Sequence, residues 1–144
     1  MRRAAPNVPR PRTIVIVLAL TIAARLATAD WEAPPDEKAK LSPLSITAKD
    51  VAKGQALFRR HCSSCHGTGG KGDGPAAGFG AEVPDDLTDP ARQDRLSDGE
   101  IFWKISNGRR QGPEIVMPSF SREISSEADR WRVVAFLRTL RREP

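Results

Sequence analysis

Apolar residues along this chain recur mostly at the three- and four-residue spacing of helices, and the first amphipathic stretch begins near residue 47. Thr47 is a candidate N-cap, because its side chain can accept a hydrogen bond from the backbone near Asp50, three residues later. The apolar positions that follow are Val51, Leu57 and Phe58. The pattern predicts a helix from Thr47 to the two cysteines.

A second helix is predicted to begin after Ser97, a candidate N-cap with Glu100 in the capping-box position, and to end at Gly108. Residues 67–91, which precede it, are dense in glycine and proline and are expected to be loop. The apolar residues of this helix are Ile101, Phe102, Trp103 and Ile105.

The last predicted helix begins at Ser125 or Ser126 and runs to about Arg141, with Asp129 completing a possible capping box for Ser126. It presents to the core the apolar residues Trp131, Val134, Ala135, Phe136 and Leu137. Residues 108–124, between the second and last helices, are expected to be loop. No segment shows sustained strand alternation, so the pattern predicts an all-α fold with long loops.

The N-terminal segment, residues 1–29, has the three parts of a secretory signal peptide. A basic part ends at Arg12, an apolar run covers residues 13–24, and Ala27-Thr28-Ala29 forms a small-residue cleavage pattern. The apolar run is shorter than the roughly 20 residues that span a membrane, although an uncleaved anchor stays open as the alternative. We therefore expect an exported, periplasmic protein.

The net charge of the chain without residues 1–29 differs from that of the whole chain. The chain of 144 residues has 23 basic and 18 acidic residues and a formal net charge of +5. Five of the basic residues and none of the acidic ones lie in residues 1–29, which leaves 18 of each sign, so nucleic acid is not an expected partner.

Residues 30–48 mix prolines with charges and predict a linker or a strap over the domain surface. Residues 49–144 are expected to hold the folded domain.

The candidate chemistry centres on Cys62-Ser63-Ser64-Cys65-His66, the C-x-x-C-H pattern of haem attachment. Thiols three residues apart in a helical turn lie on one side and can bond the two vinyl groups of one porphyrin edge, while His66 reaches the iron. A zinc site would need four ligands, and the chain has only one further histidine, His61. A thioredoxin-like pair would need neighbouring strands. The motif predicts one haem c, bound through two thioethers.

Residues from about 50 to 142 resemble the class I c-type cytochromes of bacteria. Besides the attachment motif, the resemblance rests on Gly54 and Phe58, which stand eight and four residues before Cys62. In that family a glycine and an aromatic residue at these offsets let the first helix cross closely over the last one, where Phe136 would be the partner. The resemblance implies a cytochrome c fold of three to five short helices, with long loops wrapped around one covalently bound haem.

Met117 is the only methionine besides the initiator, and by elimination it is the candidate for the second axial iron ligand, opposite His66. Pro118 favours an extended conformation at Met117, which suits a ligand presented from a strap. The segment Met117-Pro118-Ser119-Phe120 is similar to the Met-Pro-x-aromatic segment of many relatives. The alternative role for Met117 is gap-filling in the core. His61 would have to reach the opposite haem face, and we expect it at the surface.

The glycine-rich stretch after His66 lacks the preceding strand and the Gly-Lys-Ser/Thr ending of a phosphate loop. In the family that the chain resembles, this stretch wraps the proximal side of the haem, and a proline carbonyl accepts a hydrogen bond from the histidine Nδ1–H. The resemblance gives that role to Pro75, with Pro84 as the alternative.

Two pairs of residues have two interpretations each. Trp103 and Trp131 either line the haem crevice or belong to the core. Arg109 and Arg110 either neutralise haem propionates or are solvated loop charges.

Iron held by a histidine and a methionine has no open coordination position, which predicts an electron carrier and not an enzyme. Its partners would be redox proteins, a donor and an acceptor, with membrane contact only if residues 1–29 stay attached. Two alternatives stay open. One is a gas-binding sensor or enzyme in which Met117 dissociates. The other is a haem subunit of a larger oxidoreductase, with residues 30–48 as the interaction strap.

The charged residues suggest two separated poles that would steer a docking partner. Residues 82–100 contain seven acidic and two basic residues. The basic pole would be formed by the terminal helices, which contain Arg59, Arg60, Arg130, Arg132, Arg138, Arg141 and Arg142.

Overall fold

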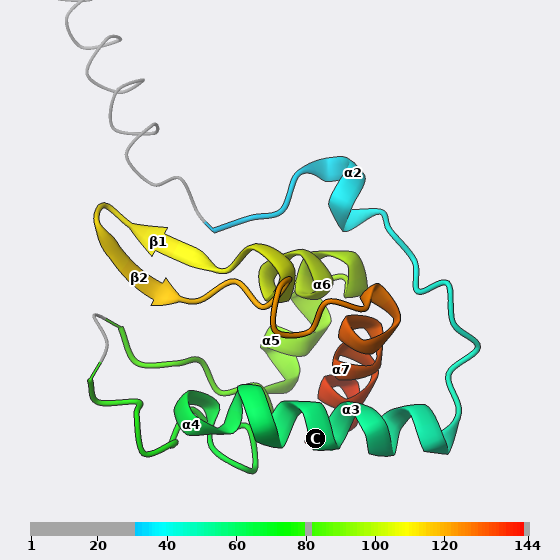
Figure 1. The fold of residues 1–144 in the computed structure, drawn as a ribbon, viewed down its shortest axis with the longest axis horizontal. Helices are drawn as coiled ribbons and strands as arrows, with labels where there is room; N and C mark the ends of the chain where they lie inside the picture. Colours follow the sequence, from blue (N-terminus) through cyan, green and yellow to red (C-terminus); the bar gives the residue numbers. More distant parts are fainter. Residues whose placement is uncertain (1–30, 80–81, 143–144) are drawn as a thin grey trace, which may run out of the picture. The chain divides into compact units, whose positions relative to one another are not determined.

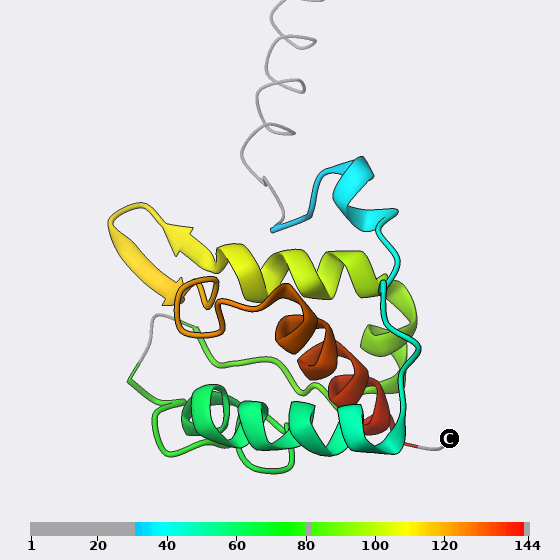
Figure 2. The same ribbon diagram turned by 45° about the vertical axis from the view of Figure 1, so that its right-hand side comes forward.

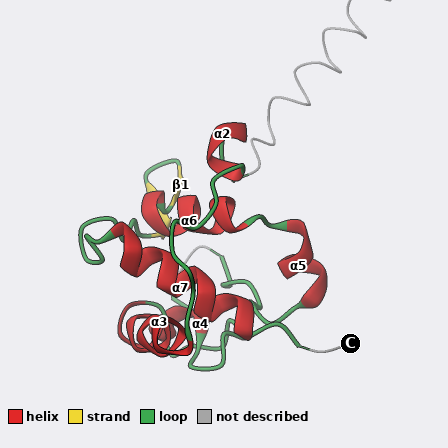
Figure 3. Cartoon of the chain, turned by 90° about the vertical axis from the view of Figure 1, so that its right-hand side faces the viewer, coloured by secondary structure: helices red, strands yellow, loops and turns green. Residues whose placement is uncertain are grey.

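Three helices carry the core of the domain in the computed structural model, which describes residues 31–79 and 82–142. They are α3 (Ala48–His61), α6 (Asp98–Asn107) and α7 (Glu127–Thr139), seen in Figure 1. Each corresponds to one of the helices predicted from the sequence. The mostly helical fold is confirmed, and Figure 3 shows how much of the rest of the described chain is loop. The signal segment predicted for residues 1–29 lies outside the described residues.

The first and last of these helices cross at closest range, as the glycine and aromatic positions predicted. A Cβ atom on Gly54 would lie 2.0 Å from the carbonyl oxygen of Arg132 and 3.1 Å from the Cβ atom of Phe136. Four residues on, the rings of Phe58 and Phe136 pack at a tilt with centroids 5.3 Å apart. Only glycine lets the two backbones approach this closely, because any side chain would collide with α7.

The helix starts follow the capping residues of the sequence. Thr47 caps α3 with a complete capping box, because its side chain accepts from the backbone of Asp50 and the Asp50 carboxylate accepts from the backbone of Thr47. Ser97 caps α6, and Ser126, not Ser125, caps α7. Each such cap stabilises its helix by about 1 kcal/mol.

Three elements depart from the pattern predicted from the sequence, which had no strand and no helix between residues 67 and 97. Residues Arg109–Gln111 (β1) and Glu114–Met117 (β2) form an antiparallel hairpin, and Pro90–Arg95 form a short helix, α5. The hairpin turns at Gly112, whose φ of 59° suits glycine. Its side chains are exposed or half-buried on both faces, so no apolar alternation marks the strands. Helix α5 is capped by Asp89, whose side chain accepts from the backbone of Ala91.

The part of the segment before α3 that contains α2 lies against α6, as Figure 2 shows. It contains one helical turn, α2 (Pro35–Lys38). A Cβ atom on Gly99 of α6 would lie 2.1 Å from the carbonyl oxygen of Glu37, and Ser97 Oγ donates to the carbonyl oxygen of Lys38 at 2.7 Å. These contacts hold the segment on the domain surface. Its boundaries at residues 30 and 48 stay predictions.

None of the helices in residues 31–79 and 82–142 has the length and apolar run needed to cross a membrane.

Candidate functional site

The attachment motif forms a helical turn directly after α3. Cys62 ends α3, and Ser63–His66 form the short helix α4. The backbone N–H groups of Cys65 and His66 both donate to the carbonyl oxygen of Cys62, at 3.2 and 2.9 Å. Helical spacing places side chains three residues apart on one side of a turn, and neither thiol is in a disulfide. Both sulfur atoms are therefore free to bond one cofactor edge.

The chemistry of Cys62 argues against a redox-active dithiol. Its side chain belongs to the hydrophobic core, and burial, with a smaller contribution from Cys65, raises the pKa of its thiol to about 12. Redox-active C-x-x-C motifs instead have a thiol of lowered pKa. No group of three or more His, Cys, Asp or Glu side chains suited to a metal ion occurs in the described part of the chain. The raised pKa of Cys62 therefore does not fit a redox-active dithiol.

His66 is held neutral at the end of the turn. Burial lowers the pKa of its imidazole, and the nearby backbone of Asp85 offsets part of that lowering. Its Nδ1 atom is buried and makes no hydrogen bond of normal geometry, so the predicted bond to the carbonyl of Pro75 is not formed in this structure. Pro75 itself is exposed. A neutral imidazole is the form that ligates a metal, and its orphaned nitrogen is ready for a carbonyl partner.

Glycines let the following loop wrap closely around this turn. The Gly72 backbone N–H donates to the carbonyl oxygen of His66 at 2.9 Å, and a Cβ atom on Gly72 would lie 2.2 Å from the carbonyl oxygen of Pro84. The Gly74 N–H donates to the carbonyl oxygen of Cys65 at 3.1 Å. The stretch is therefore a support for the attachment turn, and the Pro84–Asp85 backbone is brought to the His66 side.

Met117 is the last residue of β2, where it pairs with Arg109 of β1 and is half-buried. The chain then passes over the end of α6. A Cβ atom on Gly108 would lie 2.4 Å from the carbonyl oxygen of Met117. Beyond it, Ser119 Oγ donates to the carbonyl oxygen of Ser106 at 2.5 Å, which fastens the Met117 segment to α6.

An aromatic contact joins the segment that follows Met117 to the last residue of α3. The rings of His61 and Phe120 meet edge to face with centroids 6.3 Å apart, and the Phe120 backbone N–H donates to the carbonyl oxygen of Ile105 at 3.0 Å. His61 is half-buried by this contact, so the surface position expected for it is only partly right. The fold thus brings together two motifs that lie about 50 residues apart in sequence.

The residues present fit a haem. Two free thiols, a neutral imidazole and one thioether are the groups that would hold haem c, and the buried Nδ1 of the imidazole is left for a hydrogen bond to a carbonyl oxygen. Three of the largest exposed apolar side chains, Phe79, Val83 and Ile115, come from the loop after the attachment turn and from the Met117 hairpin. A large apolar cofactor beside these segments would cover surface that water otherwise meets.

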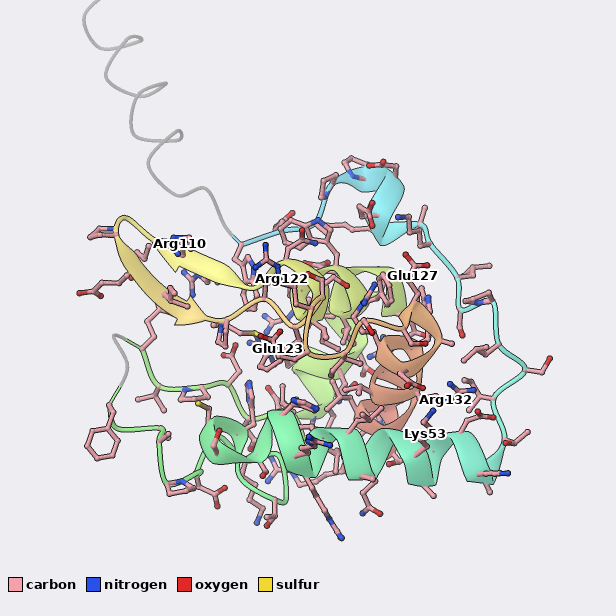
Figure 4. The ribbon with its side chains drawn as sticks, in the orientation of Figure 1. Lys53, Arg110, Arg122, Glu123, Glu127 and Arg132 are labelled. Atoms are coloured by element: carbon pink, nitrogen blue, oxygen red, sulfur yellow. The ribbon has the colours of Figure 1, made fainter. Side chains whose placement is uncertain are left out.

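Of the two tryptophans and two arginines with open roles, Trp131, Arg109 and Arg110 have protein partners for their side chains. Trp131 stacks on Phe102 with centroids 4.4 Å apart and is a core residue. Trp103 is half-buried, and nothing in the structure assigns it to a cofactor. Arg110 donates to the carbonyl oxygen of Pro113 at 2.9 Å within the hairpin, where Figure 4 shows it. Arg109 forms an ion pair with Glu82.

The expectation of separated charge poles stays a prediction, although three arginines in and just after α7 pair with the acidic segment. Arg138 donates to Asp98 at 2.6 Å, Arg141 to Asp94 at 2.9 Å and Arg142 to Asp86 at 3.2 Å. On the other side of α7, Arg132 bridges Asp50 and Asp129, and Lys53 of α3 also reaches Asp129 (Figure 4). These ion pairs connect elements that are distant in the sequence.

The sequence offered no signal for two pairs that border the site. Asp85 pairs with Arg92, and both charges act on the pKa of His66 in opposite directions. Glu82 and Arg109 stand 27 residues apart in sequence. Neither pair follows a helical or strand spacing, so only the folded loops reveal them.

Comparison with known proteins comes from sequence and from fold. Residues 49–137 match the family described as Cytochrome C oxidase, cbb3-type, subunit III. The cytochrome bc1 complex cytochrome c subunits of Corynebacterium diphtheriae and Corynebacterium efficiens are each 30% identical over 99 residues, which cover 69% of this chain. This chain spans only 30% and 29% of the length of those relatives.

A solved structure shares the fold at low sequence identity. It is a chain of the reducing HAO-like protein complex of Kuenenia stuttgartiensis, which is 24% identical with a TM-score of 0.58. The match covers 69% of this chain and 47% of that one.

Proposed function

Because the chain belongs to the family described as Cytochrome C oxidase, cbb3-type, subunit III, and is a c-type cytochrome, we propose that it carries single electrons between redox proteins. In this proposal Cys62 and Cys65 would attach one haem c, and His66 and Met117 would ligate its iron. The haem supplies the one-electron iron couple when it is bound. The observation that carries the proposal is the helical C-x-x-C-H turn, with both thiols free and the imidazole nitrogen of His66 buried without a partner.

The residues around the site would hold and shield the ligands. The loop through Gly72 and the Pro84–Asp85 backbone packs on the His66 side, and the contacts of Ser119 and Phe120 fasten the Met117 side to α6. Rigid support on both sides favours electron transfer, because little has to move when the charge on the site changes. Pro75 stays a candidate for the acceptor of the His66 Nδ1–H, in competition with the Asp85 backbone.

The role is that of a carrier and not of an enzyme. Histidine and methionine together would fill both axial positions and leave no place for a substrate on the metal. The gas-binding alternative requires Met117 to leave, and its segment is fastened by the contacts of Ser119 and Phe120.

One specific observation favours a second candidate, a haem subunit of a larger respiratory assembly. The relatives from Corynebacterium are named as subunits of a bc1 complex, and this chain matches less than a third of their length. Residues 30–48 would then be the interaction strap, and the part of this segment around α2 lies on α6. Purification of the exported protein from its own membranes distinguishes the two. A stoichiometric companion supports the subunit, and a lone protein supports the free carrier.

We propose the periplasm, or its equivalent, as the compartment, since residues 1–29 have the parts of a signal peptide. N-terminal sequencing of the mature protein tests this, with a new terminus near Asp30 expected. A terminus at Met1 would mean that the segment stays as an anchor or is not a signal.

Absorption spectra of the haem-loaded protein test the function directly. We expect a low-spin, six-coordinate spectrum in both oxidation states, and no prompt change when carbon monoxide is added to the ferrous form. Ready formation of a carbonyl complex would contradict the His66–Met117 ligation and favour the gas-binding alternative. Absence of covalent haem would contradict the whole proposal.

A further inference from the structure

An ion pair connects the hairpin that contains Met117 to the loop that follows the attachment turn. The Arg109 guanidinium, in β1, pairs with the Glu82 carboxylate, in the loop that follows the attachment turn. The side chains of Arg109 and Glu82 are 29% and 38% exposed, so water only partly screens the attraction between their charges.

On one side, Glu82 belongs to the stretch that supports His66. The next residues bring the carbonyl oxygen of Pro84 against Gly72, whose own N–H is bonded to the backbone of His66. Slightly further on, the Leu87 backbone N–H donates to the carbonyl oxygen of Gly70 at 2.7 Å. The Glu82 carboxylate is therefore attached to a loop that is fixed to the attachment turn.

On the other side, Arg109 is the residue opposite Met117 in the hairpin ladder. The hairpin is short, its register is irregular between Arg109 and Arg110, and most of its side chains are exposed. Isolated two-stranded hairpins are at best marginally stable in water. An ion pair at Arg109 therefore restrains the strand residue that pairs directly with Met117.

We propose that the Arg109–Glu82 ion pair is a latch that holds the Met117 hairpin to the His66-side loop and thereby sets how readily Met117 leaves the iron. The inference rests on the proposed function, since it assumes that Met117 is a ligand. Arg109 and Glu82 are positioning residues, and neither has to touch the haem. Opening is a ligand exchange in which the iron–sulfur bond breaks and no electron is transferred.

Carbon monoxide binding to the ferrous, haem-loaded protein measures the opening. An exposed ion pair changes an equilibrium by about two- to fivefold, so Arg109→Gln and Glu82→Gln should each raise the rate of carbon monoxide binding by about that factor. The double variant should bind no faster than either single variant, because both remove the same contact. Amide hydrogen exchange in β1 and β2 should rise in the same variants.

Two controls separate the latch from a general loss of surface charge. Arg141→Gln and Asp94→Asn break an exposed pair of similar type that does not involve the hairpin, and they should leave the binding rate unchanged. The exchanged pair, Glu82→Arg with Arg109→Glu, should return the rate toward that of the natural protein.

The outcomes for the latch and for the proposed function differ. If the natural protein binds carbon monoxide at once, the Met117 ligation and the latch both fail. If the natural protein is inert to the gas and the Arg109 and Glu82 variants are equally inert, with unchanged hydrogen exchange, only the latch is overturned. Equal effects in the Arg141 and Asp94 controls would also overturn it.

Discussion

The α carbon of Gly54 faces the carbonyl oxygen of Arg132 at such close range that a methyl group on Gly54 would lie 2.0 Å from that oxygen. The obstacle is backbone, not the end of a flexible side chain, so α3 or α7 would have to move as a whole. That movement would also separate the rings of Phe58 and Phe136.

Replacing Gly54 with alanine should therefore lower the free energy of unfolding by about 1–3 kcal/mol, the usual cost of overpacking a core contact. Urea unfolding followed by circular dichroism measures it. Gly69→Ala is the matched control, because a Cβ atom there meets nothing within 4 Å and the change should be nearly neutral. A Gly54→Ala variant as stable as the Gly69→Ala variant would contradict the close crossing.

The Asp50 carboxylate should make the free energy of unfolding depend on pH in the acidic range. Hydrogen bonds from Thr47, and next from Arg132, lower its pKa from an ordinary value near 3.8 to about 2. A pKa that is lower in the folded state stabilises the fold at every pH above about 4, and this contribution is lost as the pH falls from 4 toward 2. The Asp50→Asn variant should show a smaller loss of unfolding free energy across that interval.

Two further variants compare the contributions of Thr47 and Arg132 to the lowered pKa of Asp50. Thr47→Ala should raise the pKa of Asp50 more than Arg132→Gln does, because the Thr47 bond makes the larger contribution. Carboxyl carbon chemical shifts measured by NMR against pH give the pKa directly. The reverse order would mean that the guanidinium dominates.

Removal of the Met117 side chain should leave one coordination position of the iron without a protein ligand. The ferrous, haem-loaded Met117→Ala variant should become high-spin and bind carbon monoxide at once, and Met117→His should stay low-spin with a lower reduction potential. Leu41→Ala, 85% exposed and outside the hairpin, should leave the spectrum and the gas response as they are. An unchanged spectrum in Met117→Ala would show that another group is the ligand.

Gln93 should be the most sensitive polar residue of the domain outside the site. Its side chain is buried, its Nε2 donates to the carbonyl oxygens of Leu87 and Leu137 at 2.6 and 3.0 Å, and its Oε1 accepts from Arg138 at 2.8 Å. Gln93→Leu leaves buried polar groups without partners and should cost about 1–3 kcal/mol in unfolding free energy. Gln111→Leu, on the exposed hairpin, should cost little, and equal losses in both would contradict the network.

The helix starts were the most predictable part of the fold, since a capping side chain acts within three residues of its own position. Thr47, Ser97 and Ser126 all serve as the sequence suggests. The crossing at Gly54 was also predictable, because glycine and aromatic positions at fixed offsets from Cys62 carry it. The attachment turn follows from spacing alone, whereas the ligand role of Met117 stays a prediction.

The hairpin and the ion pairs could not be predicted in the same way. Strands exposed on both faces need no alternation of apolar residues, so β1 and β2 leave no pattern to detect. Pairs such as Arg138 with Asp98 join residues 40 positions apart, and charge type alone does not choose among many acidic candidates. The hydrogen-bond partner of His66 depends on loop geometry, which is why Pro75 was a plausible but unformed choice.

The packing of α3 on α7 has a consequence for the order of events during synthesis. The two helices that share the core are the first and last of the three, so α3 has no partner while the intervening residues are being made. Contacts between segments this distant cannot form until the later segment exists, and they slow folding because a long loop has to close. The attachment turn at the end of α3 therefore stays accessible throughout that interval. The domain closes only after the segment around Arg132 and Phe136 has emerged.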